Sequence, residues 1–289
     1  MFFRKAPIIN FFLCASASLR EINDLHDADE RLYIKWRFDL STIIAVAGKG
    51  GTGKTTTAAL IIRHLVSAGK TPVLAIDADP NSNLADSLGI TVRDSIGSVL
   101  SDFMRERAEL PAGMTKQAYL DTKFHQILEE GKDIDMLVMG CPDGPGCYCA
   151  ANSILKDYFE KLSKNYPYIV VDNEAGMEHF SRKNAARIDL LIFCSNYSLK
   201  GLKTVSSLSK MVDELKIGTD RRFLLVNRTP EVLEKEFLDG IERTGIPFLG
   251  HTVMDREIED SEIRGVPLTR LPDESTTVRR IKEMLSNVL

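Results

Sequence analysis

The sequence contains no uninterrupted apolar run of the ~18–20 residues that a helix needs to span a bilayer. It has no excess of positive charge either, because 37 lysines and arginines stand against 41 aspartates and glutamates, for a formal net charge of −4. This acidic balance argues against non-specific nucleic-acid binding as the main activity. With no internal repeat, 44% hydrophobic and 27% charged residues, the chain has the composition of an ordinary globular protein.

Cysteine is scarce as well. The chain has 5 cysteines in 289 residues, an odd number, and their spacing is not that of a disulfide framework. A protein of this kind is typical of a reducing compartment. The sequence therefore predicts a cytoplasmic protein.

One stretch of the chain carries a phosphate-binding motif. Residues 48–55, Gly48-Lys49-Gly50-Gly51-Thr52-Gly53-Lys54-Thr55, fit the pattern G-x-x-x-x-G-K-[ST] without a mismatch. The preceding residues 42–47 predict a short buried strand, and residues 56–68 carry apolar side chains at helical spacing. Strand, glycine-rich turn and helix is the context in which this motif binds a nucleoside triphosphate.

The chemistry of the motif assigns roles to its residues. Glycines allow successive backbone N–H groups to point inward, and the helix N-terminus adds partial positive charge. Lys54 is expected to reach the β- and γ-phosphates, and the Thr55 hydroxyl to bind Mg²⁺. The predicted nucleotide-binding set consists of this motif and the next residue, Thr56, together with Gly176, Asn227 and Arg228. We therefore predict ATP and Mg²⁺ as cofactors.

Strand and helix patterns alternate from residue 42 onward, which predicts one α/β domain over residues 41–289. We expect a doubly wound, mostly parallel sheet flanked by helices, with ligands at the carboxyl ends of its strands. The expected strands are residues 42–47, 72–77, 134–139, 168–172, 190–194, 223–226 and 248–253. The expected helices lie near residues 54–68, 94–108, 150–164, 200–215, 230–243 and 276–288, with Gly69, Gly218 and Gly245 where helices should stop.

Residues 1–40 do not share this pattern. A basic start followed by apolar residues faintly imitates a secretory signal, but Pro7 and Asn10 interrupt it and residues 21–32 are strongly polar. Leu40 is compatible with a UUG or CUG start codon read here as an internal leucine. We predict that residues 1–40 are an unstructured leader or a start-site artefact, which mass spectrometry of the native N-terminus would decide.

Polar residues close several of the expected strands. Asp172 ends an apolar strand, as the magnesium-side carboxylate of phosphate-loop enzymes requires. Asp77 and Asp79 end another, where the γ-phosphate of a bound nucleotide would lie, although a capped Asp-Pro turn is the alternative. Asn227, followed by Arg228, ends a third, and its amide can both donate to and accept from adenine. A simple turn asparagine is the alternative there.

Lys49 makes the motif K-G-G-T-G-K-T, which resembles the deviant phosphate loop of the MinD-like ATPases. The resemblance covers essentially residues 42–289. It implies a homodimer in which Lys49 contacts the nucleotide of the other subunit and assists catalysis. A cation supplied in this way would neutralise charge on the transferred phosphoryl group. The alternative is a solvated lysine on an exposed loop.

The same resemblance extends to two switch segments. The run Asp77-Ala78-Asp79-Pro80 resembles the first switch, which implies that Asp79 positions the attacking water and that Asp77 is a weaker magnesium candidate. The residues after Asp172 resemble the second switch, in which Gly176 would sense the γ-phosphate. The family reads its base with an asparagine at the position of Asn227.

Cys147 and Cys149 form a C-x-C pair after a glycine-proline loop. Such a pair supplies half of a tetrahedral metal shell, and a symmetric dimer would supply the other half. Together with Lys49, the pair resembles the CooC-type ATPases that mature nickel enzymes. The resemblance implies Ni²⁺ or Zn²⁺ shared at a dimer interface; thiolates accept zinc, nickel and iron–sulfur clusters alike. Whether Cys141 takes part stays open, and Cys194 is expected in the core.

These observations favour a dimerising ATPase that delivers nickel to a client metalloenzyme such as carbon monoxide dehydrogenase or acetyl-CoA synthase. An iron–sulfur carrier or a reductase-like ATPase is one alternative. A MinD-like spatial regulator is another, because Val278, Ile281, Leu285 and Val288 form an apolar stripe that would suit a membrane-binding helix. A helix docked on the sheet explains the stripe better, and neither membrane nor nucleic acid is expected as a partner.

Overall fold

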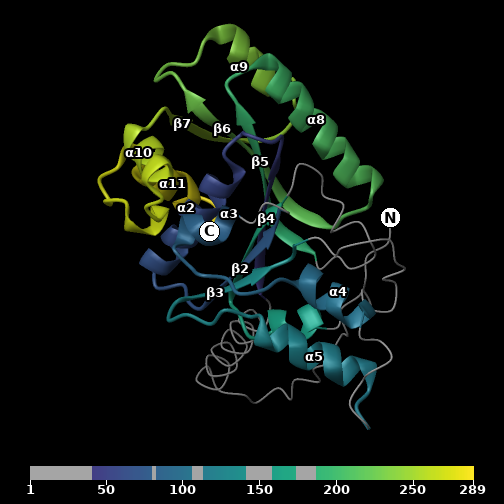
Figure 1. The fold of residues 1–289 in the computed structure, drawn as a ribbon. Helices are drawn as coiled ribbons and strands as arrows, with labels where there is room; N and C mark the ends of the chain where they lie inside the picture. The colour runs from purple at the N-terminus through teal and green to yellow at the C-terminus, as the bar shows by residue number, and fades with distance from the viewer. Residues whose placement is uncertain (1–40, 80–82, 106–112, 141–157, 174–186) are drawn as a thin grey trace, which may run out of the picture. The chain divides into compact units, whose positions relative to one another are not determined.

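The computed structural model describes residues 41–79, 83–105, 113–140, 158–173 and 187–289 (Figure 1). Contacts within residues 41–289 cluster into one compact unit. In the described ranges, none of the helices combines the length and the apolar character that crossing a bilayer requires.

A seven-stranded sheet runs through the described residues. Its strands are β1 (Thr42–Gly48), β2 (Val73–Ala78), β3 (Ile134–Val138), β4 (Tyr168–Asn173), β5 (Ile188–Asn196), β6 (Thr219–Thr229) and β7 (Phe248–Val253). Their order is β3-β2-β4-β1-β5-β6-β7, and every neighbouring pair is parallel. Because β1 lies between β4 and β5, the loop after β1 opens at the point where the strand order reverses, which is where such sheets bind ligands.

Side chains alternate between the two faces of the sheet along each strand, and both faces are buried. In β1, Ile44 and Val46 belong to the core on one face, whereas Ile43, Ala45 and Ala47 belong to the cores on the other. Near-continuous apolar strands of this kind are typical of parallel sheets covered by helices on both sides.

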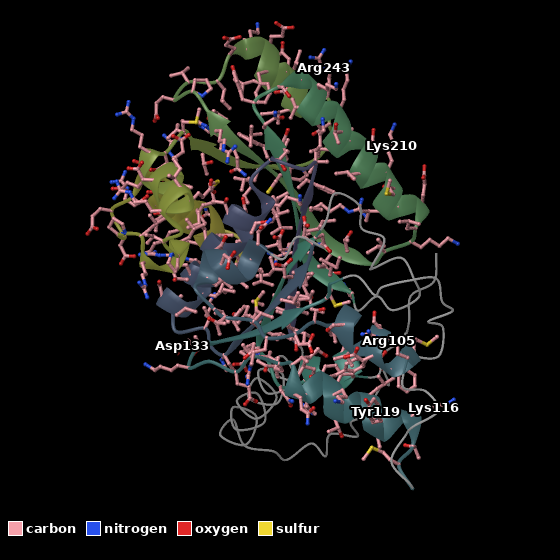
Figure 2. The ribbon with its side chains drawn as sticks, viewed as in Figure 1. Arg105, Lys116, Tyr119, Asp133, Lys210 and Arg243 are labelled. Carbon is pink, nitrogen blue, oxygen red and sulfur yellow. The ribbon has the colours of Figure 1, made fainter. Side chains whose placement is uncertain are left out.

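The helices divide between the two faces. They are α2 (Lys54–Ser67), α3 (Asn83–Leu88), α4 (Ile96–Arg105), α5 (Lys116–Gln126), α8 (Leu199–Glu214), α9 (Lys235–Glu242), α10 (Arg256–Arg264) and α11 (Thr276–Ser286). Apolar residues of α2, α3, α10 and α11 pack in one core, and those of α4, α5, α8 and α9 pack on the opposite face. Figure 1 shows α2, α10 and α11 grouped together, away from α8. Figure 2 shows Lys210 projecting outward from α8.

The predicted fold class is confirmed, and each expected strand is present. Three helices, α3, α5 and α10, were not expected, and the predicted helix at 150–164 is described only from residue 158, where 158–163 are helical. Gly69 and Gly245 have φ of 69° and 68° just after helices, as predicted. Helix α8 ends at Glu214, before Gly218, and the left-handed residue that follows it is Lys216 (φ 54°).

The apolar stripe near the C-terminus is buried. Val278, Ile281 and Leu285 of α11 lie in the core shared with α2 and β1. The Lys70 ammonium donates to the Leu289 carbonyl oxygen at 2.9 Å, and Arg221 donates to the Val288 carbonyl oxygen at 2.7 Å. The stripe therefore packs against the sheet, as the sequence favoured.

Candidate nucleotide-binding site

The phosphate loop joins β1 to α2. Gly51 and Gly53 adopt left-handed φ angles of 77° and 80°, which a residue with a side chain rarely accepts. The Thr52 hydroxyl and backbone N–H both donate to the Lys49 carbonyl oxygen, at 2.7 and 3.3 Å, and close the turn. A Cβ at Gly50 or Gly51 would meet nothing within 4 Å. Both positions are exposed and border open space.

The first turn of α2 forms an anion-binding end. Its N-cap is Gly53, which offers no side-chain cap, and the turn has no acidic residue. Its N–H groups and the positive end of the helix dipole therefore face the loop. Lys54 is 6% exposed, and its ammonium lies near enough to Asp172 to lower the pKa of that carboxyl group. A buried cation beside an uncapped helix N-terminus suits the β- and γ-phosphates of a nucleotide.

Thr55 and Asp172 meet near the carboxyl ends of β1 and β4, although they are 117 positions apart in the sequence. The Thr55 hydroxyl donates to Asp172 Oδ2 at 2.6 Å. Asp172 Oδ1 is buried and has no hydrogen-bond partner among the described residues. Burial raises the pKa of Asp172 to about 7, against the opposing effect of the Thr55 hydrogen bond. A hydroxyl paired with a carboxylate that keeps one unshared oxygen fits Mg²⁺.

Asp77 has a structural task. Its Oδ1 accepts from the Asp79 backbone N–H at 3.0 Å, and its Oδ2 accepts from the Leu84 N–H at 2.9 Å. Asp77 thereby holds the segment after β2 and the start of α3, as the capped-turn alternative requires. The water-positioning role of Asp79 stays a prediction. The neighbouring strands β2 and β4 place Asp77 and Asp172 in register.

Asn227 lies under the phosphate loop. It is 8% exposed, and its Nδ2 donates to the Thr52 carbonyl oxygen at 2.9 Å and to the Thr57 hydroxyl at 3.2 Å. Its Oδ1 accepts from the Thr252 hydroxyl at 2.9 Å. Asn227 thus connects the end of β6 to both the loop and β7. Base recognition by Asn227 stays a prediction, and it would require this amide to exchange one of its partners.

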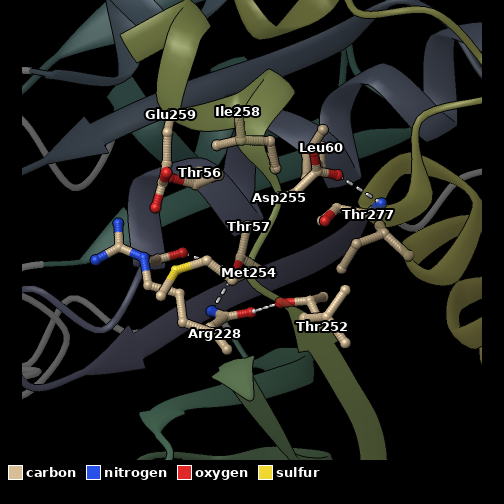
Figure 3. Close-up of a pocket in the computed structure, with 14 residues that line it drawn as sticks. Thr56, Thr57, Leu60, Arg228, Thr252, Met254, Asp255, Ile258, Glu259 and Thr277 are labelled. Carbon is tan, nitrogen blue, oxygen red and sulfur yellow. Dashed lines mark hydrogen bonds between the residues drawn. The ribbon is translucent and has the colours of Figure 1, made fainter. Parts of the chain in front are cut away.

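A pocket opens beside the end of the phosphate loop (Figure 3). Its lining includes Gly53, Thr56, Arg228, Met254 and Ile258 of α10. Figure 3 draws Arg228 and Met254 among the side chains that line the pocket. The cavity has a volume of about 40 Å³, against roughly 300–1,000 Å³ for typical small-molecule sites, so a nucleoside base would require it to widen.

The remaining predicted residues fall into two groups. Lys49 is exposed at the tip of the loop. Gly176, Cys147 and Cys149 lie outside the described residues, as does Cys141. Cys194 is buried in β5, as expected. No group of three or more histidine, cysteine, aspartate or glutamate residues placed to hold a metal occurs in the described ranges.

Sequence reasoning missed three residues at this site. Thr252 holds the Asn227 amide, and Glu262 of α10 accepts from the Thr56 hydroxyl at 3.0 Å. Asn173 donates from Nδ2 to the Val46 carbonyl oxygen at 3.0 Å, just before the phosphate loop. A sequence signal existed only for α10 itself, where Asp255 before the helix and Gly265 after it are start and stop residues.

Comparison with known proteins places this geometry in context. The chain is 36% identical over 249 residues to an uncharacterized ATP-binding protein of Methanocaldococcus jannaschii, covering 86% of this chain and 98% of that protein. It is 30% identical over 187 residues to the carbon monoxide dehydrogenase accessory protein CooC of Rhodospirillum rubrum, covering 61% of this chain and 71% of that protein.

A solved structure shares the fold. The septum site-determining protein MinD of Pyrococcus horikoshii, complexed with Mg-ADP, superposes with a TM-score of 0.62 at 19% identity, over 86% of this chain and 96% of that one. The family model for the CobQ/CobB/MinD/ParA nucleotide binding domain matches residues 43–268, from β1 to the segment after α10. With its phosphate loop, Thr55–Asp172 pair and parallel sheet, the chain belongs to the CobQ/CobB/MinD/ParA family of phosphate-loop ATPases.

Proposed function

We propose that this protein is a dimerising ATPase that couples ATP binding and hydrolysis to nickel delivery into a metalloenzyme such as carbon monoxide dehydrogenase or acetyl-CoA synthase. The observation that carries the ATPase half is the Thr55–Asp172 pair, facing an uncapped helix N-terminus that holds Lys54. The nickel half rests on the C-x-C pair of the sequence and on the similarity to the accessory protein CooC.

Each residue of the site has a task in this proposal. Lys54 and the first turn of α2 bind the phosphates, and Asp79 orients the attacking water. Thr55 and Asp172 would hold Mg²⁺, which neutralises charge on the phosphates when it is bound. Catalysis then depends on positioning and charge, as is usual for phosphoryl transfer.

Lys49 supplies the link between hydrolysis and dimerisation. It is exposed beside the phosphate site, where no element of the loop buries it. A lysine in this place can cross to a nucleotide on a second subunit and neutralise transition-state charge there. Cys147 and Cys149 of each subunit would form a shared four-sulfur site for the cargo ion in the same dimer.

Two lysine variants test the ATPase mechanism. Lys54→Ala should abolish nucleotide binding or turnover, because Lys54 holds phosphate charge directly. Lys49→Ala should bind ATP nearly as tightly as the native protein and lose hydrolysis, by about 10³-fold if the lysine acts like an arginine finger. Binding titrations and phosphate-release assays measure both. Normal turnover by Lys49→Ala would exclude the dimer mechanism.

Metal titration tests the nickel half. We expect about one Ni²⁺ per two chains, because a tetrahedral centre takes two cysteines from each subunit. ATP and metal should each tighten binding of the other, since both favour the dimer. Replacing Cys147 and Cys149 together by serine should abolish metal-driven dimerisation and leave ATP binding largely intact. The control Cys14→Ser, in residues 1–40 and so outside the predicted ATPase domain, should change neither.

Measurements on the same purified protein distinguish nickel delivery from the alternative functions. One ion per chain, unchanged in the double-serine variant, would contradict the shared site. Iron–sulfur absorbance in protein purified without oxygen would favour the carrier or reductase-like alternative. A membrane-bound regulator would need another membrane anchor than the α11 stripe, because Ile281 and Leu285 are buried.

A further inference from the structure

Glu262 of α10 reaches the first turn of the phosphate-loop helix. Its Oε1 accepts a hydrogen bond from the Thr56 hydroxyl at 3.0 Å. Its Oε2 lies 3.9 Å from a guanidinium nitrogen of Arg228, with the two side chains 43% and 50% exposed. Glu262 and Thr56 are 206 positions apart in the sequence. One carboxylate therefore engages two residues of the candidate nucleotide site.

The Glu262 carboxylate lies at a helix end that has no negative group of its own. The N-terminus of α2 has Gly53 as its cap, no side-chain cap bond and no acidic residue in its first turn. A negative charge near such an end stabilises a helix. Glu262, arriving from another element, is a negative group bonded to that turn.

A nucleotide needs the same partners. Thr56 directly follows the motif, and both Thr56 and Arg228 line the pocket next to the loop. A phosphate at the N-terminus of α2 and the Glu262 carboxylate carry charge of the same sign, so they would repel when both lie near Thr56. Because Glu262 is half-exposed, it can turn into solvent when the phosphate arrives.

We propose that Glu262 is an internal competitor of the nucleotide, which occupies the Thr56 hydroxyl and Arg228 and is displaced when the nucleotide binds. It thereby lowers nucleotide affinity while it stabilises the nucleotide-free protein. This role concerns nucleotide binding alone and does not depend on nickel delivery or on dimerisation.

Glu262→Gln tests the proposal, because glutamine keeps the shape and removes the charge. The Kd for ADP in the presence of Mg²⁺, measured by calorimetry, should fall by about three- to tenfold. The Tm of the nucleotide-free protein should fall by about 1–3 °C, because the helix end loses its anion. A purely structural residue would weaken both properties, so the opposite signs identify a competitor.

Two further variants complete the experiment. Asp260→Asn, exposed on the same helix, removes the same charge away from the pocket and should alter the Kd for ADP by less than about twofold. In a Thr56→Val background, Glu262→Gln should also change the Kd by less than about twofold, because the bond that holds Glu262 in place is gone. An unchanged or weaker ADP affinity in Glu262→Gln, an unchanged Tm, or an equal gain in Asp260→Asn would overturn the proposal.

Discussion

Asp172 shows how one residue serves two opposing needs. Its carboxyl group is buried beside Lys54 and Thr55, and burial raises its pKa to about 7. Because the folded protein holds this proton more tightly than the unfolded chain, the ionisation of Asp172 costs stability as the pH rises from about 4 to about 7. The carboxylate that would bind Mg²⁺ is therefore a destabilising group in the nucleotide-free protein.

Asp172→Asn should show that the buried charge is destabilising. At pH 8 the nucleotide-free variant should be more stable than the native protein by about 1–3 kcal/mol, because no charge is buried. At pH 5 the gain should shrink, since native Asp172 is then protonated in the folded state. Denaturant unfolding at the two pH values measures both effects. Stabilisation by Mg-ADP should be lost in the variant, and a variant that gains no stability at pH 8 would contradict this account.

At the scale of elements, Asp255 joins two helices. It caps α10 by accepting from the Glu257 N–H at 3.0 Å, and it also accepts from the Thr277 N–H of α11 at 3.0 Å and from the Ser275 hydroxyl at 3.1 Å. Partial burial acts to raise the pKa of Asp255, but these hydrogen bonds outweigh it and lower the pKa. Asp255 therefore ties α10, which lines the pocket, to α11 through one ionised side chain.

Asp255→Asn should destabilise the protein at pH 7 by about 1–2 kcal/mol, the usual range for a helix cap with a second helix attached. A lowered pKa means that the ionised form contributes stability above the unfolded-state pKa, and that this contribution is lost as the pH falls through the folded-state pKa. The difference between variant and native protein should therefore shrink below about pH 4. Urea unfolding across pH 3–7 measures this difference in the free energy of unfolding, with Asp260→Asn as control.

At the scale of the whole molecule, ATP hydrolysis should be coupled to dissociation of the dimer. Asp79→Asn removes the carboxylate expected to orient the attacking water and leaves the phosphate contacts of α2 in place. The variant should therefore accumulate as an ATP-bound dimer, which size-exclusion chromatography with ATP would detect. Tight ATP binding by a variant that stays monomeric would count against the role of Asp79.

Local chemistry made the phosphate loop predictable. Residues 48–55 determine their own backbone shape, since glycines permit the left-handed turns at 51 and 53 and the flanking patterns specify a strand and a helix. The strands were equally predictable from the sequence, because buried parallel strands are short apolar runs. Helices α3 and α5 were missed because they are short or weakly patterned, and their burial depends on tertiary contacts.

Only the tertiary structure decided which distant residues meet at the loop. The order of the strands brings Asp172 to Thr55 and Asn227 to Thr52, and the packing of α10 brings Glu262 to Thr56. Sequence patterns specify the elements and the residues at their ends, but not which element lies beside which. The sequence by itself therefore determined that the chain has a phosphate site. The tertiary structure decided that Asn227 bonds to the loop and that Glu262 bonds to Thr56, because both depend on contacts between elements far apart in the chain.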